Sequence, residues 1–157
     1  MGTRRLAGLV VLAVLLPAGQ ATAQQDREEI VGTVTGFFAA MKAKDRAGLV
    51  RYTDSLTRLT LLRPGPNGSR VLLMTGAQFL AAVTDPSRSA LDEKIRNPVV
   101  HQDGDLAMVW TPYQVHIDGK LSHCGTDAIQ LGRLGGQWKI LSVSDTVRES
   151  DCGEPWP

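Results

Sequence analysis

The chain has 157 residues, of which 17 are basic and 16 acidic, and its formal net charge is +1. This length suits one domain with one hydrophobic core, and no repeat or low-complexity linker divides it. The near balance of charge excludes partners held by bulk charge alone, such as nucleic acid or an anionic membrane surface.

The N-terminus predicts a secretory signal. Two arginines precede an unbroken apolar run at residues 6–16, and the small residues 21–23 follow it. This order is typical of a cleavable signal peptide covering residues 1–23, with the mature chain beginning near Gln24. A retained membrane anchor is the alternative, but the run is short for a membrane span. We therefore expect an exported protein, periplasmic or secreted, with no membrane attachment after cleavage.

The first half of the mature chain predicts three helices. Asp26 caps the first, in which apolar residues recur at helical spacing to about residue 43. Asp45 caps a short second helix that ends around Tyr52. Thr75, with a glutamine three residues later, predicts the capping box of a third helix.

Extended segments are predicted between the second and third helices, at residues 59–62 and 71–74. The intervening residues 63–69 are rich in proline and glycine, which predicts a loop. Residues 88–96, which include Glu93, are strongly charged. We interpret them as a solvated run before the sheet.

The last third of the chain, residues 105–148, predicts an antiparallel meander. The pairs 103–104, 118–119 and 135–136 are Asp-Gly, Asp-Gly and Gly-Gly, and each lies between strand-like runs. Such pairs tolerate the positive φ of a two-residue hairpin turn. With strand pattern beginning near Leu91, we expect four strands. Three helices followed by a long curled antiparallel sheet predict an α+β domain with the helices on one sheet face.

Cys124 and Cys152 form a pair with none left over, which predicts a disulfide in an exported protein. The bridge would tether the C-terminal tail, residues 149–157, to the sheet. A thiol nucleophile is the alternative.

A family resemblance rests on this order of elements and on three short segments. They are Trp110 to Tyr113 with Pro112, His123-Cys124-Gly125, and the closing Gly136-Gln137-Trp138-Lys139-Ile140. Together they resemble the nuclear transport factor 2-like superfamily, and within it the secreted lumazine-binding-like and SnoaL-like groups. The resemblance implies a domain at residues 24–148 whose curved sheet wraps around the helices and encloses a pocket. Members include isomerases, dehydratases, hydrolases, cyclases and non-catalytic binding or dimerisation modules, so the fold leaves the function open.

The turns also predict which strand residues face each other, provided that no β-bulge intervenes. Counting from residues 118–119 places Gln114 opposite His123, and Trp110 opposite Asp127. Counting from residues 135–136 places Asp127 opposite Ser144. Farther along these strands, Leu131 is expected opposite Ile140, and Arg133 opposite Trp138. One sheet face then carries bulky residues beside polar ones, and we expect it to line the pocket.

The predicted pocket residues come from this face and from the end of the second helix: Tyr52, Asp54, Trp110, Gln114, His123, Asp127 and Ser144. For the tryptophan the alternative is a core filler. For Asp127 it is a satisfied buried carboxylate, and for His123 a hydrogen-bonded histidine near a strand end. The three histidines lack the spacing of a metal site, and no cofactor is expected.

Three functions remain open at this point. The first is a small-molecule-binding protein with a small organic partner, which needs no matched pair of pKa values. The second is a SnoaL-like or isomerase-like enzyme in which Asp127 is the base and His123 the acid or hydrogen-bond donor. An isomerase-like tyrosine is missing from the first helix, which has Phe37 and Phe38 instead. An open cavity that Asp127 faces would favour the enzyme.

The third is a scaffold that dimerises through the opposite sheet face. The predicted interface is an apolar patch, and a homodimer is compatible with the other two functions as well. Its residues are Val109, Thr111, Tyr113, Val115 and Val143.

Overall fold

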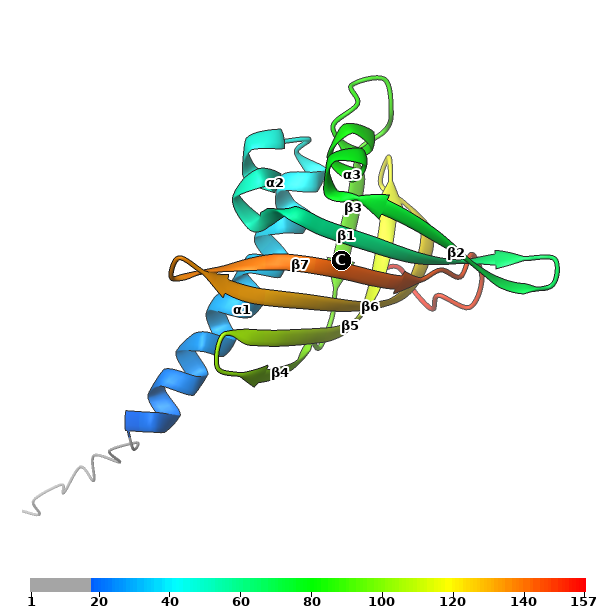
Figure 1. Ribbon diagram of the computed structural model, residues 1–157. Coiled ribbons are helices and arrows are strands. Elements are labelled where there is room, and N and C mark those ends of the chain that lie inside the picture. The colour runs from blue at the N-terminus through cyan, green and yellow to red at the C-terminus, as the bar shows by residue number, and fades with distance from the viewer. Residues whose placement is uncertain (1–17) are drawn as a thin grey trace, which may run out of the picture.

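The computed structural model describes residues 18–157, which form a curved seven-stranded sheet with three helices packed against it (Figure 1). Helix α1 spans Ala18–Lys42, α2 spans Arg46–Tyr52 and α3 spans Gly76–Val83. Most of the predicted signal peptide lies outside the described residues. Helix α1 begins eight residues before Asp26, the predicted cap, so the predicted cleavage site lies within its first turns.

The caps of the two shorter helices confirm the sequence predictions. The Asp45 side chain accepts a hydrogen bond from the backbone N–H of Gly48 at 3.0 Å. Thr75 and Gln78 form the predicted reciprocal capping box of α3. Each cap satisfies backbone donors that the first helical turn leaves without a partner.

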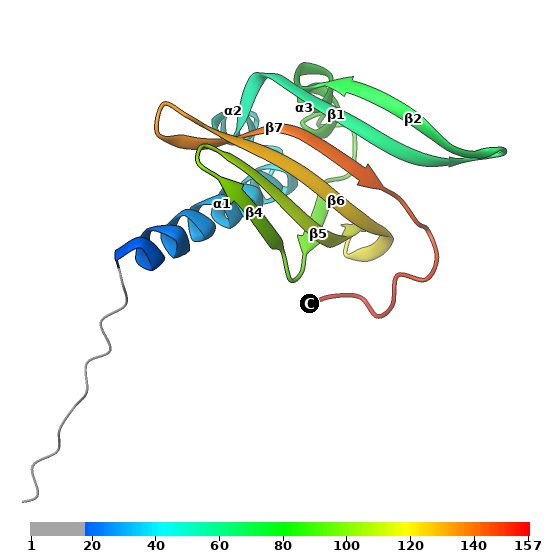
Figure 2. The ribbon, with the colours of Figure 1, turned by 60° about the horizontal axis from the view of Figure 1, so that its bottom comes forward.

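The sheet follows the order β2-β1-β7-β6-β5-β3, with β4 also paired to β5. Its strands are β1 Thr53–Gly65, β2 Gly68–Thr75, β3 Leu91–Ile95, β4 Val99–Asp103, β5 Leu106–Ile117, β6 Lys120–Leu134 and β7 Gln137–Thr146. All neighbours are antiparallel except β1 and β7. The sheet coils strongly along β5, β6 and β7, as the turned view shows (Figure 2). The predicted α+β class, with helices on one sheet face, is confirmed.

The expected loop at residues 63–69 is mostly strand. β1 and β2 remain paired out to Gly65 and Gly68, so only two residues form the turn. Pro64 fits there because the pairing of β1 with β7 ends at Leu62, which leaves the proline's other side without a strand neighbour. The first strand of the predicted four-strand meander is divided into β3 and β4, which both pair with β5. The turn expected at residues 103–104 lies at residues 104–105, between β4 and β5.

Two β-bulges change the predicted register. In β6, Val115 pairs with His123 but His116 pairs with Leu121, so Ser122 is the extra residue. In β7, Leu141 is the extra residue between the partners of Gln130 and Leu131. Each bulge shifts the partners beyond it by one position and exchanges the faces of one strand relative to its neighbour.

The predicted pairs lie on both sides of these bulges. Leu131 faces Ile140 and Arg133 faces Trp138, as expected. Beyond the bulges the prediction is wrong. Gln114 faces Cys124, Trp110 faces Ala128, and Asp127 faces Asp145 rather than Ser144.

The hydrophobic core lies between α1 and the concave sheet face. Ile30, Val34 and Met41 of α1 are almost fully buried, as are Ile129 and Ile140 of the sheet. The face of β5 predicted to dimerise is part of this interior. Val109 and Thr111 are fully buried, and Tyr113, Val115 and Val143 nearly so. That predicted interface is therefore wrong.

Candidate functional site

A cavity of about 180 Å³ lies between the helices and the concave face of the sheet. Its apolar wall includes Phe37, Phe38 and Met41 from α1 and Phe79 from α3. The rings of Phe37 and Phe79 stack with centroids 5.7 Å apart, and Phe37 meets Phe38 edge to face at 5.4 Å. The wall is therefore predominantly aromatic on the helix side.

The sheet side of the cavity carries the polar groups. They come from five strands and are Arg63, Glu93, Tyr113, His123, Asp127 and Asp145. Alternate residues of a strand point to the same face, so each lies two positions from another interior residue. A small set of polar groups in an apolar cavity is typical of a ligand site.

Arg63 and Asp145 form an ion pair inside the cavity. Two guanidinium nitrogens of Arg63 donate to the two carboxylate oxygens of Asp145, at 2.5 and 3.0 Å. Both side chains are largely shielded from solvent. This two-bond geometry is the strongest that arginine makes with a carboxylate, so the charge of Arg63 is already matched.

Asp127 is 2% exposed, and within residues 18–157 its carboxyl group forms no ion pair. Burial raises its pKa to about 7; a hydrogen bond with the Glu93 carboxyl group opposes this rise, the charge of Asp145 adds to it, and the charge of Arg63 opposes it. Burial also raises the pKa of Glu93 well above its usual value, followed by the charge of Asp127. Two carboxyl groups can hydrogen-bond only when one carries a proton. Near neutral pH this pair therefore holds protons that ordinary surface carboxyl groups have lost.

Tyr113 and His123 complete the polar set. The Tyr113 hydroxyl donates to the backbone oxygen of Thr146 at 2.9 Å, and burial raises the pKa of the phenol. The ring of His123 meets the Tyr113 ring edge to face at 6.0 Å. Burial and then the charge of Arg63 lower the pKa of His123, so its imidazole is neutral at pH 7.

The structure brings only two of the predicted pocket residues to the cavity, Asp127 and His123. Trp110, Gln114 and Ser144 lie on the other sheet face because of the two bulges. Trp110 is 52% exposed there. They do not line this cavity.

Tyr52 and Asp54 also lie away from the cavity. Tyr52 packs close to Gly36 of α1, where a Cβ atom would come within 2.5 Å of the phenol ring. It borders a shallow surface groove together with Trp138. The Asp54 carboxylate accepts a hydrogen bond from the backbone of Leu56 at 2.8 Å, which shapes the start of β1.

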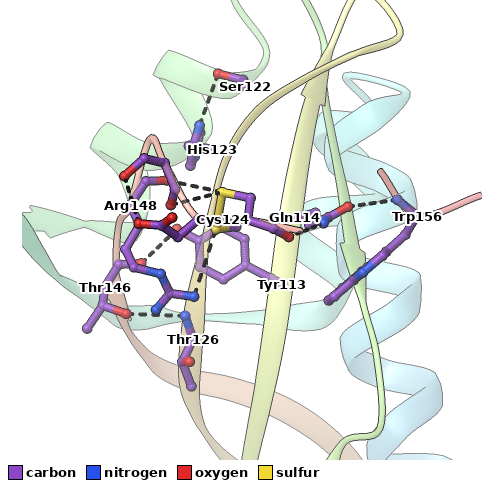
Figure 3. Close-up of a disulfide and its surroundings, with 12 residues drawn as sticks. Tyr113, Gln114, Ser122, His123, Cys124, Thr126, Thr146, Arg148 and Trp156 are labelled. Atoms are coloured by element: carbon purple, nitrogen blue, oxygen red, sulfur yellow. Dashed lines mark hydrogen bonds between the residues drawn. A yellow bond between two sulfur atoms is a disulfide. The ribbon is translucent and has the colours of Figure 1, made fainter. Parts of the chain in front are cut away.

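Gln114 anchors the C-terminal tail on the outer sheet face. Its side chain donates to the backbone oxygens of Cys152 and Glu154 at 2.8 and 3.1 Å and accepts from the backbone N–H of Trp156 at 2.8 Å. The predicted disulfide between Cys124 and Cys152 is present beside it (Figure 3). The guanidinium of Arg96 lies 4.5 Å from the centre of the Trp156 ring. The tail is thus bound to the sheet by covalent, polar and cation–π contacts.

Four polar residues of the cavity were not predicted from the sequence: Arg63, Glu93, Tyr113 and Asp145. Glu93 lies between Leu91 and Ile95 in strict alternation, and this signal identifies an inward-facing position despite the charges around it. Arg63 stood in the expected loop. The register expected without bulges does not place Tyr113 or Asp145 on the pocket face, and the two bulges change that register.

Within residues 18–157, the cavity carboxylates and His123 do not converge into a group of three ligands that would suit a metal ion. No helix of this described part is long and apolar enough to cross a membrane.

Comparison with known proteins gives a fold. No protein-family model matches the chain, and no curated protein matches it. Among solved structures, an NTF-2 like protein of unknown function from Silicibacter pomeroyi aligns with a TM-score of 0.60 at 19% identity, covering 80% of this chain and 98% of the other. The chain has the nuclear transport factor 2-like fold.

Two further solved structures have similar folds. A protein of unknown function from Mycobacterium tuberculosis aligns with a TM-score of 0.68 at 13% identity, covering 82% of this chain and 75% of the other. A candidate dehydratase of the nuclear transport factor 2-like family from Streptomyces avermitilis aligns with a TM-score of 0.62 at 18% identity, covering 79% and 96%. The TM-scores of these structures establish the shared fold. Their sequence identities are too low to indicate function, which must be argued from the site itself.

Proposed function

We propose that the protein binds a small organic molecule in the cavity between α1, α3 and the sheet. The observation that carries this proposal is the unmatched carboxyl pair of Asp127 and Glu93 facing an aromatic wall. A buried carboxylate without a cation is costly even beside another carboxyl group, and a ligand that supplies a further hydrogen-bond donor recovers that cost. The volume of about 180 Å³ suits a molecule of about one ring, since an apolar cavity of about 150 Å³ holds benzene.

Native mass spectrometry of the mature protein, purified from its own host, tests this proposal. We expect a small organic mass on the wild type that is lost in Asp127→Ala. The matched control is Ser144→Ala, whose side chain lies on the outer face, and it should keep the mass. Retention by Asp127→Ala, or loss from both variants, would contradict binding at this cavity.

Acid–base catalysis is the second candidate, because Asp127 faces the cavity with a pKa of about 7. A group with this pKa is well suited to accept and return a proton at neutral pH. Two possible donors to a developing oxyanion are already engaged, however, since Tyr113 bonds to Thr146 and Arg63 to Asp145. Binding is therefore the function that the geometry supports best. Conversion of the co-purified molecule by wild type and not by Asp127→Asn would establish catalysis.

Export is part of the same proposal. The Cys124–Cys152 disulfide supports it, because such bonds persist in oxidising compartments such as the bacterial periplasm. N-terminal sequencing of the protein from its own host should begin near Gln24. A chain that keeps residues 1–23 would contradict the signal peptide.

A homodimer remains a proposal, now through other residues than those first expected. Val99, Met108 and Trp110 are exposed on the outer face, and Val99 pairs directly with Trp110 across β4 and β5. Exposed apolar side chains that lie together favour an interface. Analytical ultracentrifugation should show a dimer that Trp110→Asp converts to monomer; a monomeric wild type would contradict it.

A further inference from the structure

We propose that the ligand is a protonated organic amine, whose ammonium group binds between Glu93 and Asp127 and whose apolar body lies against the phenylalanine wall. This inference rests on the proposed function and adds the chemical class of the molecule. It follows from the charges, burial and ring positions of the cavity residues.

The cavity has more acidic groups than cations. Three carboxyl groups line it, from Glu93, Asp127 and Asp145, and Arg63 is the one permanent cation among the described lining residues. Asp145 holds Arg63 through two hydrogen bonds. The charges of Arg63 and Asp145 therefore cancel each other. The carboxyl pair of Glu93 and Asp127 has no such counter-charge among the described lining residues.

The geometry of Asp127 shows where the missing donor belongs. The residue is 2% exposed, and its Oδ2 atom has no hydrogen-bond partner among residues 18–157. An ionised carboxylate is an acceptor only, so a neighbouring carboxylate cannot satisfy it without a proton. An ammonium group has three donors and a positive charge, enough to bond to both carboxyl groups at once.

The rest of the cavity fits the organic part of such a ligand. Phe37, Phe38 and Phe79 line the side that the helices cover, and Tyr113 lies on the sheet side. Aromatic faces attract cations and also bury apolar surface. A metal ion would not use these rings, whereas an amine on a small ring or branched chain would.

No other described group in the cavity competes for the site. The titratable or charged groups facing it are Arg63 of β1, Glu93 of β3, Tyr113 of β5, His123 and Asp127 of β6 and Asp145 of β7, while α1 and α3 contribute only apolar side chains. His123 is neutral at pH 7 because burial and Arg63 lower its pKa. A bound cation would thus take the place of the proton that this pair holds near neutral pH.

Three one-ring probes of similar size test the inference: benzylammonium, benzyl alcohol and benzoate. Isothermal titration calorimetry at pH 8 should show benzylammonium binding at least tenfold more tightly than benzyl alcohol, with benzoate weakest. Asp127→Asn and Glu93→Gln should each remove this preference. Ser144→Ala, on the outer face, should retain it, and circular dichroism will show whether each variant is folded.

The pH dependence gives a second readout that needs no variant. An ammonium ligand favours the ionised form of Asp127, so binding tightens as pH rises through the pKa of about 7. Linkage of one proton predicts about 30-fold weaker affinity at pH 5.5 than at pH 8. Carbon NMR of the Asp127 carboxyl group should show its pKa falling when benzylammonium is added.

The outcomes separate this inference from the proposed function. Equal or tighter binding of benzyl alcohol would overturn the amine while leaving a small-molecule cavity standing. Preference for benzoate would overturn it in the same way, with Arg63 as the group to examine. Failure of all three probes to bind would overturn the amine and count against a one-ring ligand of any charge.

Discussion

Asp127 and Asp145 lie directly opposite each other in the paired strands β6 and β7, and in the described part of the chain only Asp145 forms an ion pair. Like charges at facing positions of a sheet destabilise it. Arg63 relieves the repulsion on one side, while Asp127 remains buried beside Glu93. The two aspartates therefore contribute to stability with opposite sign, and this asymmetry is measurable.

We expect Asp127→Asn to stabilise the protein at pH 8. The folded-state pKa of Asp127 is about 7, above its ordinary value of 3.8, so the folded state binds more protons between these values. The free energy of unfolding therefore falls as pH rises from about 4 to about 7, and above pH 7 the buried Asp127 carboxylate destabilises the folded state. The full shift corresponds to on the order of 4 kcal/mol. Urea unfolding from pH 4 to pH 8 should show a flatter profile for the variant than for the wild type.

Asp145→Asn is the matched control, since it makes the same change at the facing position. It leaves Arg63 without its carboxylate in a largely shielded site, so we expect a loss of about 1 to 3 kcal/mol at pH 8. Stabilisation by both variants would mean that general acidity, rather than the missing cation, destabilises the site. Destabilisation by Asp127→Asn would contradict a raised pKa.

The Cys124–Cys152 disulfide should hold the tail against the sheet and contribute measurably to the free energy of unfolding of the protein. It joins residues 28 apart in sequence. Closing a loop of this length lowers the entropy of the unfolded chain, a stabilisation of about 3 to 4 kcal/mol. The double variant Cys124→Ala, Cys152→Ala should lose about this much in urea unfolding. Reductant should destabilise the wild type equally and leave the double variant unchanged; sensitivity of that variant to reductant would contradict the assignment.

Gln114 should hold the tail independently of the disulfide. Its fully buried amide makes three hydrogen bonds to the backbone of residues 152–156. Gln114→Ala removes them all and leaves buried polar groups without partners, which costs about 1 to 3 kcal/mol. Hydrogen exchange at the Trp156 amide should accelerate, while that of Ile129 in the core should not. Unchanged protection of Trp156 would show that the disulfide alone holds the tail.

The elements of this fold could be predicted from sequence because their signals are local. The caps of α2 and α3, the Asp118-Gly119 and Gly135-Gly136 turns and the cysteine pair each depend on a few neighbouring residues. Both residues of these two turns have positive φ, as the two-residue hairpin requires.

The faces of the strands could not be predicted in the same way. One extra residue at Ser122 and another at Leu141 decide them, and neither has a distinctive sequence. Asp127 and His123 lie beyond the bulge in β6 and face the cavity, whereas Gln114 and Trp110 of β5 do not. Ser144 lies beyond the bulge in β7, which brings Asp145 inside in its place. A charge expected in solvent, Glu93, and an arginine expected in a loop, Arg63, then complete a site that only the folded sheet assembles.

Gly125 should be the least replaceable glycine of the sheet. A Cβ atom there would lie 1.8 Å from the backbone oxygen of Thr146 and 2.7 Å from the Tyr113 ring. Because the backbone cannot yield locally, Gly125→Ala must separate the end of β7 from β6 and displace Tyr113 from the cavity wall. We expect a loss of at least about 3 kcal/mol in urea unfolding and weaker binding of any cavity probe. Gly132→Ala is the control, because the atoms nearest to its Cβ would belong to the side chain of Leu141, at 2.9 Å, and a side chain can rotate away. A similar loss in both variants would show that glycine flexibility, rather than the close approach of Thr146, determines the effect.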